Sequence, residues 1–112
     1  MSAITTHILD TSKGMPAAGV DVSLEVRDDA GTWCLVGNGV TDDDGRNRAL
    51  MPGALTAGIY RITFDTAGYY QRLGQRTFYP EVRIAFEVHD ADQHYHVPLL
   101  LNPFGYSTYR GS

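Results

Sequence analysis

Hydrophobic and polar residues alternate along much of the chain with a period of two, which is the pattern of half-buried β-strands. The three clearest runs are 20–28, 58–65 and 81–90. Weaker runs of the same kind cover 6–10, 32–41, 94–102 and 105–112. In the clearest runs every second residue is aliphatic or aromatic, so one face of each expected strand packs against a core.

Clusters rich in glycine, proline and aspartate separate these runs and mark turns. They are SKGMPAAG at 12–19, RDDAG at 27–31, TDDDG at 41–45, MPGALTAG at 51–58 and NPFG at 102–105. The segment 66–75 is the one helical candidate, about two turns long and closed by Gly74. Short strands joined by turns, without an internal repeat or a linker, predict an antiparallel β-sandwich in a single domain spanning residues 1–112.

The composition is that of a folded domain, and the net charge argues against one class of partner. The chain has 112 residues, of which 43% are hydrophobic and 11% aromatic. A chain of this size can bury one sizeable core. Its 9 basic and 13 acidic residues give a net charge of −4. The strongly basic surface of a nucleic-acid-binding protein is therefore missing.

Nothing in the sequence indicates a membrane segment. No stretch approaches the ~20 apolar residues of a membrane span. The N-terminal segment 1–10 has neither the basic region nor the apolar run of a signal peptide. We therefore expect no membrane partner and a cytoplasmic location, with a removed periplasmic or organellar presequence as the open alternative.

The single cysteine, Cys34, cannot form an internal disulfide. It stands in TWCLV, within a predicted strand and without a histidine or lysine neighbour that would lower the pKa of its thiol. We expect a half-buried strand residue rather than a reactive thiol.

Histidines are the first candidates for chemistry. His94 and His96 are two positions apart and so share one strand face, and His7 lies in the first predicted strand. Three histidines are the minimum for a metal site, but no cysteine or glutamate accompanies them. Ordinary surface or core histidines are the favoured interpretation. His89 precedes a turn and is expected to be exposed to solvent.

The segment TDDDGRNR at 41–48 places three carboxylates before a glycine and two arginines after it. It begins like a calcium-binding loop, but the bidentate glutamate that such a loop needs does not follow. We expect Asp42–Gly45 to form a tight turn in which Gly45 has a positive φ. A guanidinium directly after the turn would suit a planar anion or a carbonyl group.

The last eight residues, GYSTYRGS, are richer in functional groups than a frayed terminus needs. In an extended strand the segment 105–112 presents two sets of side chains on opposite sides. One set is Tyr106, Thr108 and Arg110, and the other is Ser107, Tyr109 and Gly111.

Several motifs, taken together, resemble the transthyretin-related 5-hydroxyisourate hydrolases, enzymes of urate breakdown. The resemblance covers residues 4–112 in order. Its motifs are ITTHILDTSKGMPAAGVDVSL, TDDDGR, GIYRITFDTAGYY and FYPEVRIAFEVHDADQHYHVPLLLNPFGYSTYRGS, which ends in YRGS.

This resemblance implies a fold, an assembly and a reaction. The implied fold is the transthyretin-like (prealbumin-like) antiparallel β-sandwich of two four-stranded sheets with one short α-helix. The implied assembly is a homotetramer with active sites at the interface between dimers. The implied reaction opens the six-membered ring of 5-hydroxyisourate with water and gives 2-oxo-4-hydroxy-4-carboxy-5-ureidoimidazoline. No metal or organic cofactor is implied.

The family's functional residues fall on seven positions of this chain, which are His7, Arg46, His96, Tyr109, Arg110, Gly111 and Ser112. Arg48 lies outside the family's pattern and is not included. His7, Arg46, Tyr109, Arg110 and Ser112 are expected to bind substrate.

The chemistry of these residue types agrees with the implied reaction. Histidine suits the removal of a proton from water, so we expect His96 to activate the water and His7 to be its partner. Which of the two accepts the proton is left open. Arg46 would stabilise charge on the carbonyl oxygens. Tyr109 would hydrogen-bond the ring or the water, and Ser112 with its carboxylate would hold the ring or the catalytic side chains.

Two alternatives belong to other classes of protein. The same fold serves as a hormone carrier, but carriers lack the two histidines and the arginine at these positions and do not end in YRGS. An immunoglobulin-like adhesion domain would explain the strands but neither the tail nor the spacing of His94 and His96.

Overall fold

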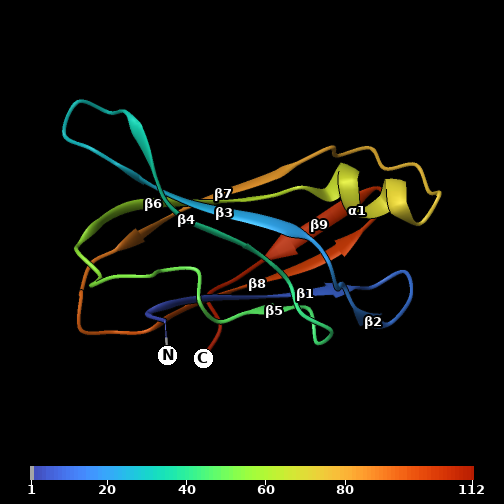
Figure 1. Ribbon diagram of the computed structural model, residues 1–112, viewed down its shortest axis with the longest axis horizontal. Helices are drawn as coiled ribbons and strands as arrows, with labels where there is room; N and C mark the ends of the chain where they lie inside the picture. The colour runs from blue at the N-terminus through green and yellow to red at the C-terminus, as the bar shows by residue number, and fades with distance from the viewer. Residues whose placement is uncertain (1) are drawn as a thin grey trace.

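The computed structural model describes residues 2–112, which form nine strands and one helix in two stacked sheets (Figure 1). The strands are β1 (Ile4–Asp10), β2 (Met15–Pro16), β3 (Asp21–Arg27), β4 (Trp33–Val40), β5 (Arg46–Asn47), β6 (Gly58–Phe64), β7 (Val82–Val88), β8 (Tyr95–Asn102) and β9 (Gly105–Thr108), and the helix is α1 (Thr66–Arg72). One sheet has the order β2-β1-β8-β9, with β5 also paired to β1, and the other has the order β4-β3-β6-β7.

The predicted sandwich is confirmed, with two additions. The two-residue strands β2 and β5 lie in or directly after segments expected to be turns. Both pair with the same edge of β1, β5 opposite Thr6 and His7 and β2 opposite Leu9 and Asp10. One sheet therefore has five strands rather than the expected four.

The strands are antiparallel to their neighbours with one exception within residues 2–112. β1 and β8 run parallel, in continuous register from Ile4 opposite Tyr95 to Asp10 opposite Leu101. Their alternation of buried and partly exposed residues is that of any half-buried strand, so the sequence pattern did not distinguish the two directions.

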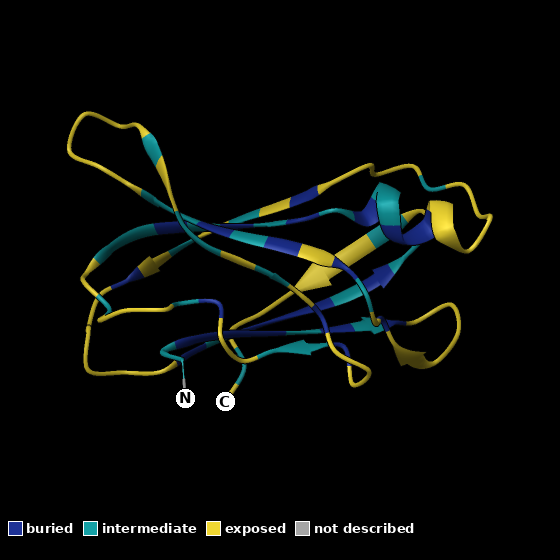
Figure 2. Cartoon of the chain, in the orientation of Figure 1, coloured by how far each residue is buried: buried dark blue, intermediate teal, exposed yellow. Residues whose placement is uncertain are grey.

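The core lies between the two sheets and is built from the faces that the alternation predicted (Figure 2). Its fully buried side chains include Ile4, Ile8, Leu24, Tyr60, Ile62, Phe64, Tyr70 and Leu99. In Figure 2 the buried segments lie along strands of both layers, whereas the loops and β9 are largely exposed.

The helix α1 is anchored to the sheet that contains β1. Asp65 caps its N-terminus by accepting a hydrogen bond from the Gly68 amide at 3.0 Å. From the helix, the Tyr69 hydroxyl donates to Asp10 Oδ2 at 2.8 Å, and Asp10 is fully buried. Within residues 2–112 no helix is long and apolar enough to cross a membrane.

Cys34 is exposed, so the expectation of a half-buried cysteine was wrong. A register shift between Leu24 and Glu25 interrupts the pairing of β3 with β4. The hairpin that joins these strands then projects beyond the body of the sandwich (Figure 1). At the first residues of β4, the alternation of apolar and polar side chains therefore does not match which side chains are buried.

The buried contact between Tyr69 and Asp10 gives a test of the fold. We expect Tyr69→Phe to lower the free energy of unfolding by about 1–3 kcal/mol, because it leaves a buried carboxylate without one of its donors. Tyr106→Phe is the control for loss of a tyrosine hydroxyl away from Asp10, because Tyr106 lies on β9 and is 42% exposed. Urea denaturation of both variants measures the difference, and equal losses would show that the contact with Asp10 contributes nothing.

Candidate functional site

The parallel pair β1–β8 places two of the predicted histidines on one face of the sheet. In this register Thr5 is opposite His96 and His7 is opposite Pro98, and in the antiparallel pair β1–β5 Arg46 is opposite His7. Residues that pair directly across strands project from the same face. This is the face turned away from the core, because the alternate residues of β8 are buried between the sheets.

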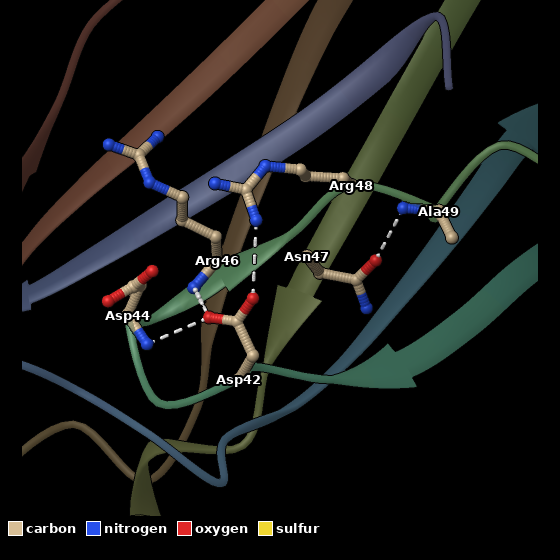
Figure 3. Close-up of polar contacts among 6 residues, drawn as sticks. All are labelled: Asp42, Asp44, Arg46, Asn47, Arg48 and Ala49. Carbon is tan, nitrogen blue, oxygen red and sulfur yellow. Dashed lines mark hydrogen bonds and ion pairs between the residues drawn. The ribbon is translucent and has the colours of Figure 1, made fainter. Parts of the chain in front are cut away.

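The turn before β5 orients Arg46. Asp42 Oδ1 accepts hydrogen bonds from the amides of Asp44 at 2.9 Å and Arg46 at 3.0 Å (Figure 3). Asp42 Oδ2 lies 3.4 Å from the Arg48 guanidinium. The side chains of Arg46 and Arg48 extend to the same side of the turn in Figure 3. Within residues 2–112 Arg46 forms no ion pair, so its charge is available to a ligand.

Gly45 closes this turn against β1. Its φ is 74°, as the sequence predicted, and a Cβ added there would lie 2.4 Å from the Ile8 carbonyl oxygen. The Gly45 carbonyl accepts a hydrogen bond from the Ile8 amide at 2.8 Å. Only glycine permits this approach, which holds the arginine-bearing segment at the edge of β1.

Thr5 connects His94 and His96. Its Oγ1 lies 2.8 Å from His96 Nδ1 and 3.1 Å from Nε2 of His94, just before β8. Thr5 is buried, His96 is half-buried and His94 is exposed. These contacts fix the plane of the His96 ring and leave its Nε2 free.

The tail continues β9 along β8 and ends beside His96. Pairing of Thr108 with Leu99 and of Gly111 with His96 follows one register. Between them the ladder is interrupted opposite Pro98, which has no amide hydrogen. The Thr108 hydroxyl donates to the Pro98 carbonyl at 2.7 Å, and the Gly111 amide donates to the His96 carbonyl at 2.9 Å.

Tyr109 and Arg110 leave the ladder at this interruption. Tyr109 is 58% exposed and directs its side chain to solvent. The Arg110 guanidinium lies over the Tyr95 ring, 4.4 Å from its centroid, and donates to Gln93 Oε1 at 2.8 Å. Arg110 is therefore held by contacts within the chain, whereas Arg46 is not.

Two adjoining pockets share His96. The smaller, of about 180 Å³, is lined by Thr5, Thr6, Arg46, Arg48, His94, His96 and Ser112. The larger, of about 420 Å³, runs between β7 and the tail, and its lining includes Phe86, Tyr95, His96, Tyr109 and Arg110. The predicted site residues are thus divided by His96, with Arg46 and Ser112 on one side and Tyr109 and Arg110 on the other. His7 lies beside Arg46 without lining either pocket.

Residues 4–111 match the model of the HIUase/Transthyretin family. The chain belongs to this family. A 5-hydroxyisourate hydrolase of Salmonella dublin is 47% identical over 110 residues, which cover 97% of this chain and 80% of that protein. The resemblance inferred from the sequence motifs is therefore confirmed.

Solved structures of family members superpose over almost the whole chain. The Klebsiella pneumoniae 5-hydroxyisourate hydrolase has a TM-score of 0.85 and 38% identity, covering 97% of this chain and 98% of its own. Sea bream transthyretin in complex with thyroxine has a TM-score of 0.92 and 33% identity, covering 97% of this chain and 94% of its own. The backbone of this chain is thus similar both to that of an enzyme and to that of a thyroxine-binding protein.

Burial and neighbouring charges favour the neutral form of both His7 and His96. Burial is the main cause that lowers the pKa of His96, and Arg46, His7 and His94 lower it further. Burial and then the charge of Arg46 lower the pKa of His7, against the opposing influence of Asp44 and Asp42. Neutral imidazoles beside an unpaired guanidinium can accept protons at neutral pH.

The described residues do not support the metal alternative. Among residues 2–112 no group of three or more histidine, cysteine, aspartate or glutamate side chains is placed to hold a metal ion. His94 and His96 are hydrogen-bonded to Thr5 instead. His89 is 77% exposed, as the sequence predicted.

Sequence reasoning missed Thr5 as a residue of the smaller pocket and left out Arg48, which also lines it. A spacing signal exists for each, since Thr5 is two residues before His7 and Arg48 is two residues after Arg46. That signal places a residue on a strand face but does not identify its hydrogen-bond partner.

The lowered histidine pKa values give a pH dependence of stability. Their ordinary value is 6.5, so below it the unfolded chain takes up protons that His7 and His96 resist in the folded state. We expect the free energy of unfolding to fall as the pH is lowered below 6.5, and this loss to be smaller in a His7→Gln/His96→Gln variant. Urea denaturation between about pH 8 and about pH 5 measures both, and identical pH profiles would contradict the shifts.

Proposed function

We propose that this chain hydrolyses 5-hydroxyisourate and that the pocket beside His96 is its active site. One observation carries the proposal. A histidine with a lowered pKa and an arginine without an ion pair line the same small pocket, in a family whose members include 5-hydroxyisourate hydrolases. The larger pocket would extend the site toward the tail.

The reaction begins with removal of a proton from water. We assign this step to Nε2 of His96, because its Nδ1 is already engaged by Thr5. The resulting hydroxide adds to the carbonyl carbon of the six-membered ring and forms a tetrahedral intermediate. When the ring carbon–nitrogen bond breaks, His96 returns the proton to the leaving nitrogen. The products are a carboxylic acid and a ureido group, and the acid then releases its proton to solvent and becomes a carboxylate, so atoms and charge balance.

Arg46 is assigned to the charge that develops during this addition. Its guanidinium would donate hydrogen bonds to the carbonyl oxygen as that oxygen becomes negative. Asp42 supports this role by binding the amide of Arg46 rather than its guanidinium. His7 is opposite Arg46 in the β1–β5 ladder, where it would orient the water or the ring. The tail residues Tyr109 and Ser112 would hold the ring from the other side.

A homotetramer is part of the proposal. A pocket of about 180 Å³ is smaller than the ~300–1,000 Å³ typical of ligand sites, so a second subunit would complete it. β7 and β9 are edge strands of the two sheets, and an exposed edge favours pairing with another chain. Pairing of these edges between subunits would place the His96 pockets near an interface.

Carriage of a small aromatic ligand is the weaker candidate. It is supported by the TM-score of 0.92 with sea bream transthyretin in complex with thyroxine, which rests on the backbone. Sequence identity is higher to the Klebsiella hydrolase, at 38% against 33%. Fold does not decide between the two activities, whereas the side chains of the site do.

Decay of 5-hydroxyisourate tests the proposal directly. Urate oxidase generates the compound from urate, and its ultraviolet absorbance then falls spontaneously. We expect the protein to accelerate this decay, His96→Ala to reduce kcat by ~10²–10⁴-fold, and Arg46→Ala to reduce it by ~10²–10³-fold.

Arg76→Ala is the matched control for loss of an arginine, because Arg76 is exposed in the loop after α1. It should keep full activity. A wild-type protein that leaves the spontaneous decay unchanged would refute the hydrolase, and full activity in both site variants would refute only the site.

Removal of residues 109–112 tests the role of the tail. We expect it to abolish the acceleration, because it removes Tyr109, Ser112 and the Gly111 amide that binds the His96 carbonyl. The fold should persist, since β9 ends at Thr108.

Sedimentation velocity of the full and truncated chains, with circular dichroism, separates loss of chemistry from loss of structure. Both are expected to sediment as tetramers. An active truncated protein would make the tail a structural segment only, and a monomeric full chain would contradict the proposed assembly.

A further inference from the structure

Thr5 lies within hydrogen-bonding distance of both His94 and His96. Its Oγ1 is 2.8 Å from His96 Nδ1 and 3.1 Å from His94 Nε2, and 5% of its surface is exposed. A threonine hydroxyl has one hydrogen to donate and two lone pairs to accept with. It can therefore donate to only one of the two imidazoles. The ring nitrogen of the other imidazole must carry a hydrogen and donate it to Thr5 Oγ1.

This constraint couples the tautomers of His94 and His96. If Thr5 donates to His96 Nδ1, neutral His96 carries its proton on Nε2 and cannot accept one there. If His96 Nδ1 donates to Thr5, Nε2 is unprotonated, and the Thr5 hydrogen is free to bind Nε2 of His94. Only the second arrangement gives His96 a lone pair at its free nitrogen.

The surroundings of His96 favour the second arrangement. With Nδ1 turned to Thr5 on β1 and Cδ2 toward Gly111, Nε2 lies at the outer end of the ring. Arg46 lines the same pocket with an unpaired positive charge. A lone pair near a cation is more stable than an N–H dipole directed at it. In this arrangement His94 carries its hydrogen on Nδ1. Because His94 is exposed, this N–H can donate a hydrogen bond to water.

We propose that Thr5, backed by His94, is a positioning residue that holds His96 in the tautomer with a proton on Nδ1 and a lone pair on Nε2. This inference rests on the proposed hydrolase, in which Nε2 of His96 takes the proton of the attacking water. Once Nε2 is protonated, the imidazolium donates from Nδ1 to Thr5 through a charge-assisted hydrogen bond, which is stronger than the neutral one. Thr5 itself neither gains nor loses a proton.

Kinetics of matched threonine variants test the role. Thr5→Val keeps the shape but removes the hydroxyl, and should lower kcat by about 10- to 100-fold while changing KM by less than about threefold. Thr5→Ser restores the hydroxyl and should recover most of kcat. Thr66→Val is the control for loss of a buried hydroxyl far from the site, since Thr66 donates to the Tyr79 carbonyl, and it should keep wild-type kcat.

The tautomer can be measured without substrate. In protein labelled with ¹⁵N-histidine, two-bond ¹H–¹⁵N correlation spectra above the pKa of His96 should show an Nδ1–H form. Thr5→Val should shift it toward Nε2–H. His94→Leu removes the acceptor of the Thr5 proton and should cause a partial shift in the same direction, with a smaller loss of kcat.

Each outcome decides one claim. An Nε2–H form of His96 in the wild-type protein would overturn the inference, as would a Thr5→Val protein with unchanged tautomer and kcat. A Thr5→Ser protein that folds but stays as slow as Thr5→Val would also overturn it, because the hydroxyl would then not be the group that matters. If the wild-type protein fails to accelerate decay, the hydrolase is refuted, while the spectra still report whether Thr5 sets the tautomer.

Discussion

The parallel pairing of β1 with β8 is the constraint from which the site follows. These strands are far apart in sequence, and one register determines which of their side chains meet on the outer face of the sheet. A shift by a single residue would exchange the inner and outer faces of β8, burying His96 and exposing its apolar neighbours. The core therefore enforces the register, because Ile8 and Leu99 are fully buried on the inner face. The contact between Thr5 and His96 therefore depends on packing that lies on the other side of the sheet.

Segments at the two edges of this sheet place an arginine and the tail residues next to the histidines of β1 and β8. β5 adds Arg46 beside His7, through a turn held by Asp42 and closed by Gly45. On the other side the tail follows β8 and reaches His96 where Pro98 interrupts the ladder. Arg46 and the tail residues are thus carried by short segments at the edges of the sheet, whereas His7 and His96 lie on its long, packed strands. This division would suit the proposed site, in which His96 accepts the proton and a second subunit completes the pocket around the substrate.

Much of the fold followed from alternation alone, and what was missed has physical reasons. Period-two patterns identified the long strands and the buried face of each, but strand direction leaves no mark on such a pattern, so the parallel pair was not predicted. Exposure of Cys34 was missed because alternation predicts a face and not whether another sheet covers it. His7, Arg46 and His96 were found through motifs, yet the hydrogen bonds of Thr5 depend on a register that no local segment encodes.

Proteins with this backbone include a 5-hydroxyisourate hydrolase and a transthyretin that binds thyroxine, and this chain indicates how that is possible. In this chain the buried inner faces of the two sheets and the contact of the helix with Asp10 stabilise the sandwich. Thr5, His7 and His96 lie on the outer face of β1 and β8 and do not belong to the hydrophobic core, so we expect substitutions there to leave the sandwich folded. A backbone can therefore superpose with a TM-score of 0.92 on a thyroxine-binding relative. Under the proposed function, polar side chains at a few outer positions, together with the burial that lowers the pKa of the histidines, would separate a hydrolase from a carrier on the same backbone.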